Sequence, residues 1–113
     1  MNIDATSTRD VLIQTDHLNE AVRFYETVLG LRVNHRGETL VGLETGSFCL
    51  YVEKGPSYGP VFEFIVSDLA AAKEQLIAAG CRVEAEDPSI PRCYIRDPFG
   101  LIFNLAVRKQ GGR

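Results

Sequence analysis

Residues 11–33 read VLIQTDHLNEAVRFYETVLGLRV, and residues 62–83 read FEFIVSDLAAAKEQLIAAGCRV. Each stretch is an apolar run, a short polar break, a segment with helical periodicity, and a glycine followed by a second apolar run. The copies match at an offset of 51 at His17 and Asp68. Two copies of a unit of about fifty residues predict two similar halves, and a ligand site often lies where such halves meet.

The first copy predicts one helix flanked by strands. Residues 10–15 alternate between two faces, as expected for a strand. Asp16 is expected to cap the helix, and Gly30 to end it. The residues expected on the buried side of this helix are Leu18, Val22, Phe24, Tyr25 and Leu29. Further strands are predicted over residues 31–33, 39–43 and 47–53.

The second copy predicts the same order of elements. Residues 61–66 favour a strand, Ser67 or Asp68 a helix cap, and Gly80 the end of the helix. Strands are then predicted over residues 81–85, 92–96 and 101–107, with a loop over residues 86–91. The sequence Asp97-Pro98-Phe99-Gly100 predicts the turn between the last two strands. Arg92 and Arg96 are expected to pair with surface acids; alternatively, they contact an anionic ligand.

The repeat therefore predicts an α+β fold made of two βαβββ modules. Each helix is expected to cover one sheet face and to leave the other face free to form a cleft. The modules span about residues 10–54 and 60–108, joined by a Gly/Pro-rich connector over residues 54–60, within one domain of residues 1–113. Residues 1–8 are polar and are expected to fray.

Composition excludes several partners. Hydrophobic content of 45% and charged content of 24% are those of an ordinary globular protein. With a net charge of -3 and no basic stripe, nucleic acid is not expected. Membrane insertion and secretion are not expected either, because no apolar run is long enough and no signal peptide is visible. Without CxxC spacing, the cysteines Cys49, Cys81 and Cys93 are expected to be free buried thiols in a cytoplasmic protein.

Two stretches resemble the vicinal oxygen chelate superfamily: Phe24-Tyr25-x3-Leu29-Gly30, and Asp97-Pro98-Phe99-Gly100-x3-Asn104-Leu105. That superfamily includes glyoxalase I, bleomycin resistance proteins, extradiol dioxygenases and fosfomycin resistance enzymes. The resemblance covers about residues 10–107. It implies two βαβββ modules in a pseudo-twofold arrangement, with sheets curled around a central cleft. It also implies a homodimer, with modules paired within one chain or swapped between two.

Metal-using relatives hold a divalent ion in the cleft with His, Glu or Gln side chains from the first and last strands of each module. On this sequence the resemblance places Asp10 and Val61 on the first strands, and Cys49 and Asn104 on the last. Valine cannot ligate, an asparagine oxygen is a weak ligand, and a carboxylate and a thiolate favour different ions. Neither histidine of the chain belongs to a ligand pair. We therefore predict no metal and no cofactor.

The cleft is expected to be mostly apolar with a few polar groups, which is typical of a small-molecule pocket. Alternation along the strands gives the candidate ligand-binding residues Asp10, Leu12, Gln14, Cys49, Tyr51, Val61, Glu63 and Asn104. No catalytic residue is predicted. The two carboxylates favour a cationic ligand, because a buried charge is tolerated when it is paired. Alternatively, this face is a dimer seam and the carboxylates are solvated.

Three functions from different classes remain. The first is a binding protein without a metal that holds a small, cationic molecule, as antibiotic-sequestering resistance proteins do. The second is an enzyme of the superfamily (a lyase, dioxygenase or transferase) that uses an atypical metal set or acid–base chemistry by Asp10 or Glu63. The third is a structural module that dimerises with another protein. We expect the first, a small-molecule-binding protein rather than an enzyme.

Overall fold

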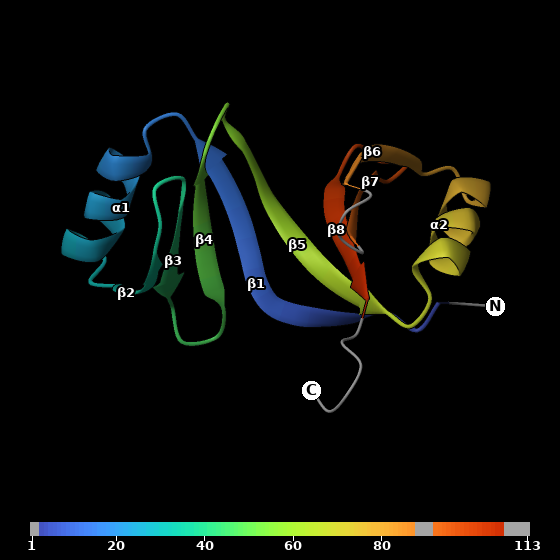
Figure 1. The fold of residues 1–113 in the computed structure, drawn as a ribbon, viewed down its shortest axis with the longest axis horizontal. Helices are drawn as coiled ribbons and strands as arrows, with labels where there is room; N and C mark the ends of the chain where they lie inside the picture. The colour runs from blue at the N-terminus through green and yellow to red at the C-terminus, as the bar shows by residue number, and fades with distance from the viewer. Residues whose placement is uncertain (1–2, 88–91, 108–113) are drawn as a thin grey trace. The chain divides into compact units, whose positions relative to one another are not determined.

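The computed structural model describes residues 3–87 and 92–107. These residues contain the elements of two βαβββ modules in succession (Figure 1). The first module is β1 (Thr6–Thr15), α1 (Leu18–Thr27), β2 (Arg32–Arg36), β3 (Leu40–Glu44) and β4 (Cys49–Lys54). The second is β5 (Tyr58–Val66), α2 (Leu69–Ala78), β6 (Arg82–Asp87), β7 (Arg92–Arg96) and β8 (Ile102–Val107). The predicted α+β class and the order of elements are confirmed. The predicted loop over residues 86–91 is described only at its start, where β6 extends to Asp87.

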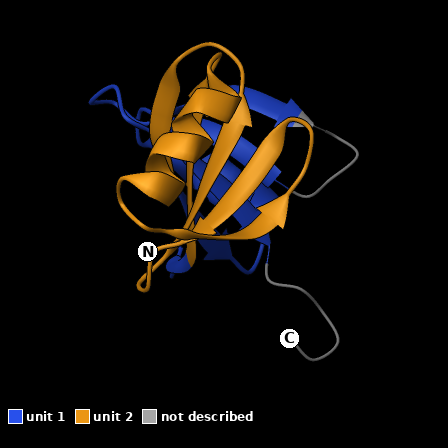
Figure 2. Cartoon of the chain, turned by 90° about the vertical axis from the view of Figure 1, so that its left-hand side faces the viewer, with its two compact units in different colours: residues 1–8, 62–113 blue, residues 9–61 orange. Residues whose placement is uncertain are grey.

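The chain divides into two compact units (Figure 2). Unit 2 is residues 9–61, and unit 1 is residues 1–8 together with residues 62–113. The expectation of a frayed N-terminus is wrong for Ile3, which packs against the core of unit 1, and for residues 6–8, which already belong to β1. Neither helix of the described residues has the length or hydropathy required to cross a bilayer.

In unit 2 the strand order is β2-β3-β4-β1, with β1 parallel to β4 and the other pairs antiparallel. One face of these strands packs against α1 through a core of Leu18, Val22, Val41, Leu43 and Val52. The predicted burial is wrong for two residues, since Phe24 is 49% exposed and Leu29 is 56% exposed. Phe24 lies two residues after Val22 on α1, so its side chain points away from the buried face of the helix. Leu29 lies beyond the end of α1 at Thr27.

In unit 1 the strand order is β5-β8-β7-β6, with β5 parallel to β8. The core between α2 and these strands consists of Val66, Ala72, Cys81, Cys93, Ile95 and Leu105. The predicted turn is confirmed, because Asp97 Oδ1 accepts hydrogen bonds from the Phe99 and Leu101 N–H groups at 2.9 and 3.0 Å. The signature motif thus holds the β7–β8 hairpin closed.

The two helices begin differently. Asp68 caps α2 as predicted, since its Oδ1 accepts a hydrogen bond from the Ala71 N–H group at 3.0 Å. The predicted cap of α1 by Asp16 is wrong: the N-cap residue is His17, whose side chain makes no capping bond. Thr15 Oγ1 accepts a hydrogen bond from the His17 N–H group just before the helix.

Candidate functional site

In unit 2, five of the candidate residues share the sheet face opposite α1. Their strand neighbours Ile13, Leu50 and Val52 pack towards α1, so the alternation of side chains directs the candidates to the other face. The register pairs two of them with two others, Asp10 with Cys49 and Leu12 with Tyr51. Asp10, Leu12, Gln14, Cys49 and Tyr51 therefore lie on the face away from α1, and their role in ligand binding stays a prediction.

Contacts on this face restrain most of its polar groups. Gln14 Nε2 donates to Glu53 Oε1 at 2.9 Å. Asn34 Nδ2 lies 3.4 Å from the sulfur of Cys49, which is 4% exposed. The sequence did not identify Asn34, because it follows from a register shift between Val33 and His35 that no turn signal predicts.

Tyr51 lies against a glycine of the neighbouring strand. A Cβ atom added to Gly42 would be 2.9 Å from Tyr51 Cε1 and 2.7 Å from Asn34 Oδ1. The absence of a side chain at Gly42 therefore lets the ring of Tyr51 and the amide of Asn34 lie over β3. This gives the unit 2 face an aromatic surface next to a thiol and an amide.

In unit 1, the candidates Glu63 and Asn104 are register partners on the parallel strands β5 and β8. Asn104 Nδ2 donates to Glu63 Oε2 at 2.7 Å, and Arg92 Nη2 lies 4.0 Å from the same oxygen. Asn104 is 5% exposed, and the side chain of Glu63 is 15% exposed. The resemblance grouped Asn104 with Val61 as metal-ligand positions. The strand register instead pairs Asn104 with Glu63. Val61 belongs to unit 2 and is buried.

Other carboxylates are held by arginines and backbone groups. The guanidinium of Arg96 donates to both oxygens of Glu84 at 2.9 and 3.2 Å and lowers the pKa of that carboxyl. The Gly46 N–H group, and then Arg9, lower the pKa of Glu44. Arg96 thus pairs with an acid as predicted, and both carboxylates have structural partners.

The donor set is a poor match to the metal site that the resemblance implies. Within residues 3–87 and 92–107, no three His, Cys, Asp or Glu side chains are grouped so that they could hold a metal ion. Of the four positions, Val61 has no donor atom and Cys49 is in contact with Asn34. At the fourth, Asn104 Nδ2 donates to Glu63, which leaves only Oδ1, a weak neutral ligand atom.

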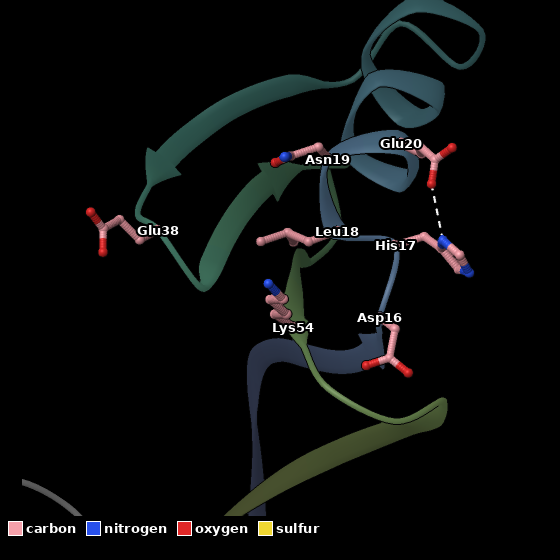
Figure 3. Close-up of a pocket in the computed structure, with 7 residues that line it drawn as sticks. All are labelled: Asp16, His17, Leu18, Asn19, Glu20, Glu38 and Lys54. Atoms are coloured by element: carbon pink, nitrogen blue, oxygen red, sulfur yellow. Dashed lines mark hydrogen bonds and ion pairs between the residues drawn. The ribbon is translucent and has the colours of Figure 1, made fainter.

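A depression of about 310 Å³ lies at the start of α1 in unit 2 (Figure 3). His17 Nδ1 and Glu20 Oε1 lie 3.0 Å apart on its rim, with side chains 76% and 77% exposed. Figure 3 shows Glu38 well apart from this pair, on the far side of Leu18. Solvent screens such exposed groups strongly, and the acids and Lys54 at the rim define no single ligand chemistry.

The thiols should react slowly in the folded protein. Cys49, Cys81 and Cys93 are all free, and 4%, 8% and 0% exposed. Burial raises the pKa of the Cys81 and Cys93 thiols, which lowers the fraction of reactive thiolate at pH 8. We expect 5,5′-dithiobis(2-nitrobenzoate) to titrate three thiols at once in guanidinium chloride but only slowly without it. Rapid native labelling of Cys93 in a Cys49→Ser, Cys81→Ser variant would contradict the described packing.

Comparison with known proteins identifies the family. The family model for the glyoxalase-like domain matches residues 10–106. An extradiol ring-cleaving dioxygenase from Brevibacterium fuscum has 21% identity and a TM-score of 0.72, over 99% of this chain and 35% of its own. Homoprotocatechuate 2,3-dioxygenase from Arthrobacter globiformis has 22% identity and a TM-score of 0.71, over 99% of this chain and 39% of its own.

The chain thus spans little more than a third of these dioxygenase chains. A hypothetical protein from Bacillus halodurans C-125 is similar over nearly its whole length, with 11% identity, a TM-score of 0.69, and 97% and 99% of the two chains covered. A search of curated proteins gave no match. These likenesses show the fold, and the family model covers most of the chain. The protein therefore belongs to the glyoxalase-like domain family of the vicinal oxygen chelate superfamily.

Proposed function

We propose that this protein binds a small molecule without a metal ion, at the sheet faces opposite the helices. The observation that supports this most directly is the Glu63–Asn104 pair, a largely buried carboxylate whose contacts are an amide and an arginine. A partly buried carboxylate with a fixed amide partner is a polar group that can orient a ligand in a pocket. Apolar and aromatic neighbours with a few fixed polar groups are what a ligand pocket requires.

Metal analysis tests the first half of this proposal. The purified protein is equilibrated with zinc, manganese, iron and nickel salts, desalted, and analysed for metal. We expect far less than one ion per chain, because in the part of the chain that the structure describes no three His, Cys, Asp or Glu side chains are grouped so that they could hold a metal ion. Stoichiometric metal that disappears in Asp10→Ala but persists in Asp16→Ala, a change at an exposed neighbouring acid, would instead support the superfamily enzyme with an atypical ligand set.

Thermal denaturation with a panel of cationic, neutral and anionic aromatic compounds tests the second half. A ligand at a hundred times its Kd stabilises the native state by about 2.7 kcal/mol, which raises the Tm by several degrees. A panel in which no compound raises the Tm would favour a structural module over a binding protein. The homodimer that the resemblance implies remains a prediction.

A further inference from the structure

Two acceptor atoms of the Glu63–Asn104 pair are unused. Both contacts of the carboxylate, from Asn104 Nδ2 and Arg92 Nη2, go to Oε2. Among the residues that the structure describes, no donor reaches Glu63 Oε1 or the buried Asn104 Oδ1. The amide orientation is fixed, because a flip would bring Asn104 Oδ1 to 2.7 Å from Glu63 Oε2, acceptor against acceptor.

The unused acceptors define the chemistry of a matching ligand. A buried carbonyl oxygen without a donor is unfavourable, and an N–H group from outside relieves this cost. Hydrogen bonds from a cation to a carboxylate are the stronger kind. A group with positive charge and two or more N–H bonds satisfies both oxygens, whereas a quaternary ammonium ion supplies charge alone.

We propose that Glu63 and Asn104 form a subsite for an amidinium, guanidinium or primary ammonium group of the bound molecule. This inference rests on the proposed small-molecule binding. Arg92 is the group that gives way to the ligand, since its side chain is 48% exposed and its nitrogen lies 4.0 Å from the carboxylate. Tyr94 is the register partner of Asn104 on β7 and shares its face, so an aromatic ring lies beside the cation.

Three probes with one aromatic ring separate charge from hydrogen bonding: benzamidine, benzyltrimethylammonium and benzoate. Titration of the full chain is followed by the side-chain amide resonances of Asn104, assigned by their loss in Asn104→Leu. We expect benzamidine to shift these resonances and to bind about tenfold or more tightly than benzyltrimethylammonium, with benzoate weaker still. Glu63→Gln keeps the shape of the side chain and should weaken benzamidine binding about tenfold.

The matched control is Glu86→Gln, which changes another paired acid of unit 1, 2.6 Å from Lys73 and outside the subsite. It should leave benzamidine affinity unchanged. Equal affinities for the two cations, or an unchanged affinity in Glu63→Gln, would overturn the subsite. The same holds if none of the three probes moves the Asn104 resonances. The proposed function is tested separately by the thermal denaturation panel. A neutral or anionic compound that raises the Tm would support small-molecule binding even if the cation subsite is wrong.

Discussion

Replacing Leu43 with alanine should lower the free energy of unfolding by about 2–5 kcal/mol. Leu43 is 0% exposed on β3 and packs with Leu18, Val22 and Val52 beneath α1. The substitution removes buried methyl groups and leaves a cavity that strands bonded on both sides cannot close. Urea denaturation followed by far-UV circular dichroism measures the change as a lower midpoint.

The matched control is Leu29→Ala, at a position that the sequence placed in the same core. Leu29 is 56% exposed beyond the end of α1, so its loss should change the free energy of unfolding by less than about 0.5 kcal/mol. Similar losses of unfolding free energy in the two variants would show that Leu29 is buried, as the sequence predicted, and would contradict the described packing. A large loss in Leu43→Ala alone supports the packing described above.

Periodicity predicted the elements because each has one buried face. The pattern over residues 61–66 and the glycines Gly30 and Gly80 gave the order of strands and helices correctly, and both glycines have positive φ, 74° and 103°. The ends of elements were less predictable. Asp16 has the right side chain for a cap, but the N-cap position falls one residue later, at His17, whose side chain makes no capping bond.

For the candidate site, the sequence predicted which strand faces its residues lie on, but not the contacts between their side chains. Strand alternation placed Cys49 and Tyr51 opposite α1 correctly, because a shift of one residue would expose every apolar neighbour. The pairing of Glu63 with Asn104 joins strands 41 residues apart. Parallel strands have no connecting turn that sets their register, so this contact had no local signal in the sequence.

The two modules differ where chemistry would be expected. Glu63 and Asn104 are register partners on β5 and β8, and the repeat offset of 51 places Leu12 at the position of Glu63. The register partner of Leu12 is Tyr51. One module therefore has a charged, hydrogen-bonding pair where the other has an apolar and aromatic pair. The repeat therefore conserves the fold of the two modules but not the side chains at these matched positions.

Replacing Gly59 with alanine should lower the free energy of unfolding by about 2–5 kcal/mol, which combines backbone strain and overpacking. Gly59 lies near the start of β5 with a φ of 104°, where a side chain is strained. An added Cβ atom would also lie 2.8 Å from the Leu12 carbonyl oxygen and 3.2 Å from Ile13 Cα. Both are backbone atoms of β1, so no rotation of a side chain relieves the contact. Urea denaturation measures the loss.

The control Gly46→Ala separates the two causes. Gly46 has a similar φ of 110°, but an added Cβ atom there would meet nothing within 4 Å. Its substitution should therefore cost only the strain of about 1–2 kcal/mol. The excess in Gly59→Ala reports the collision with the strand that carries Leu12 and Gln14. If the two variants lose the same amount, the backbone at Gly59 can move away from β1, and the candidate face of unit 2 is less rigid than its hydrogen bonds indicate.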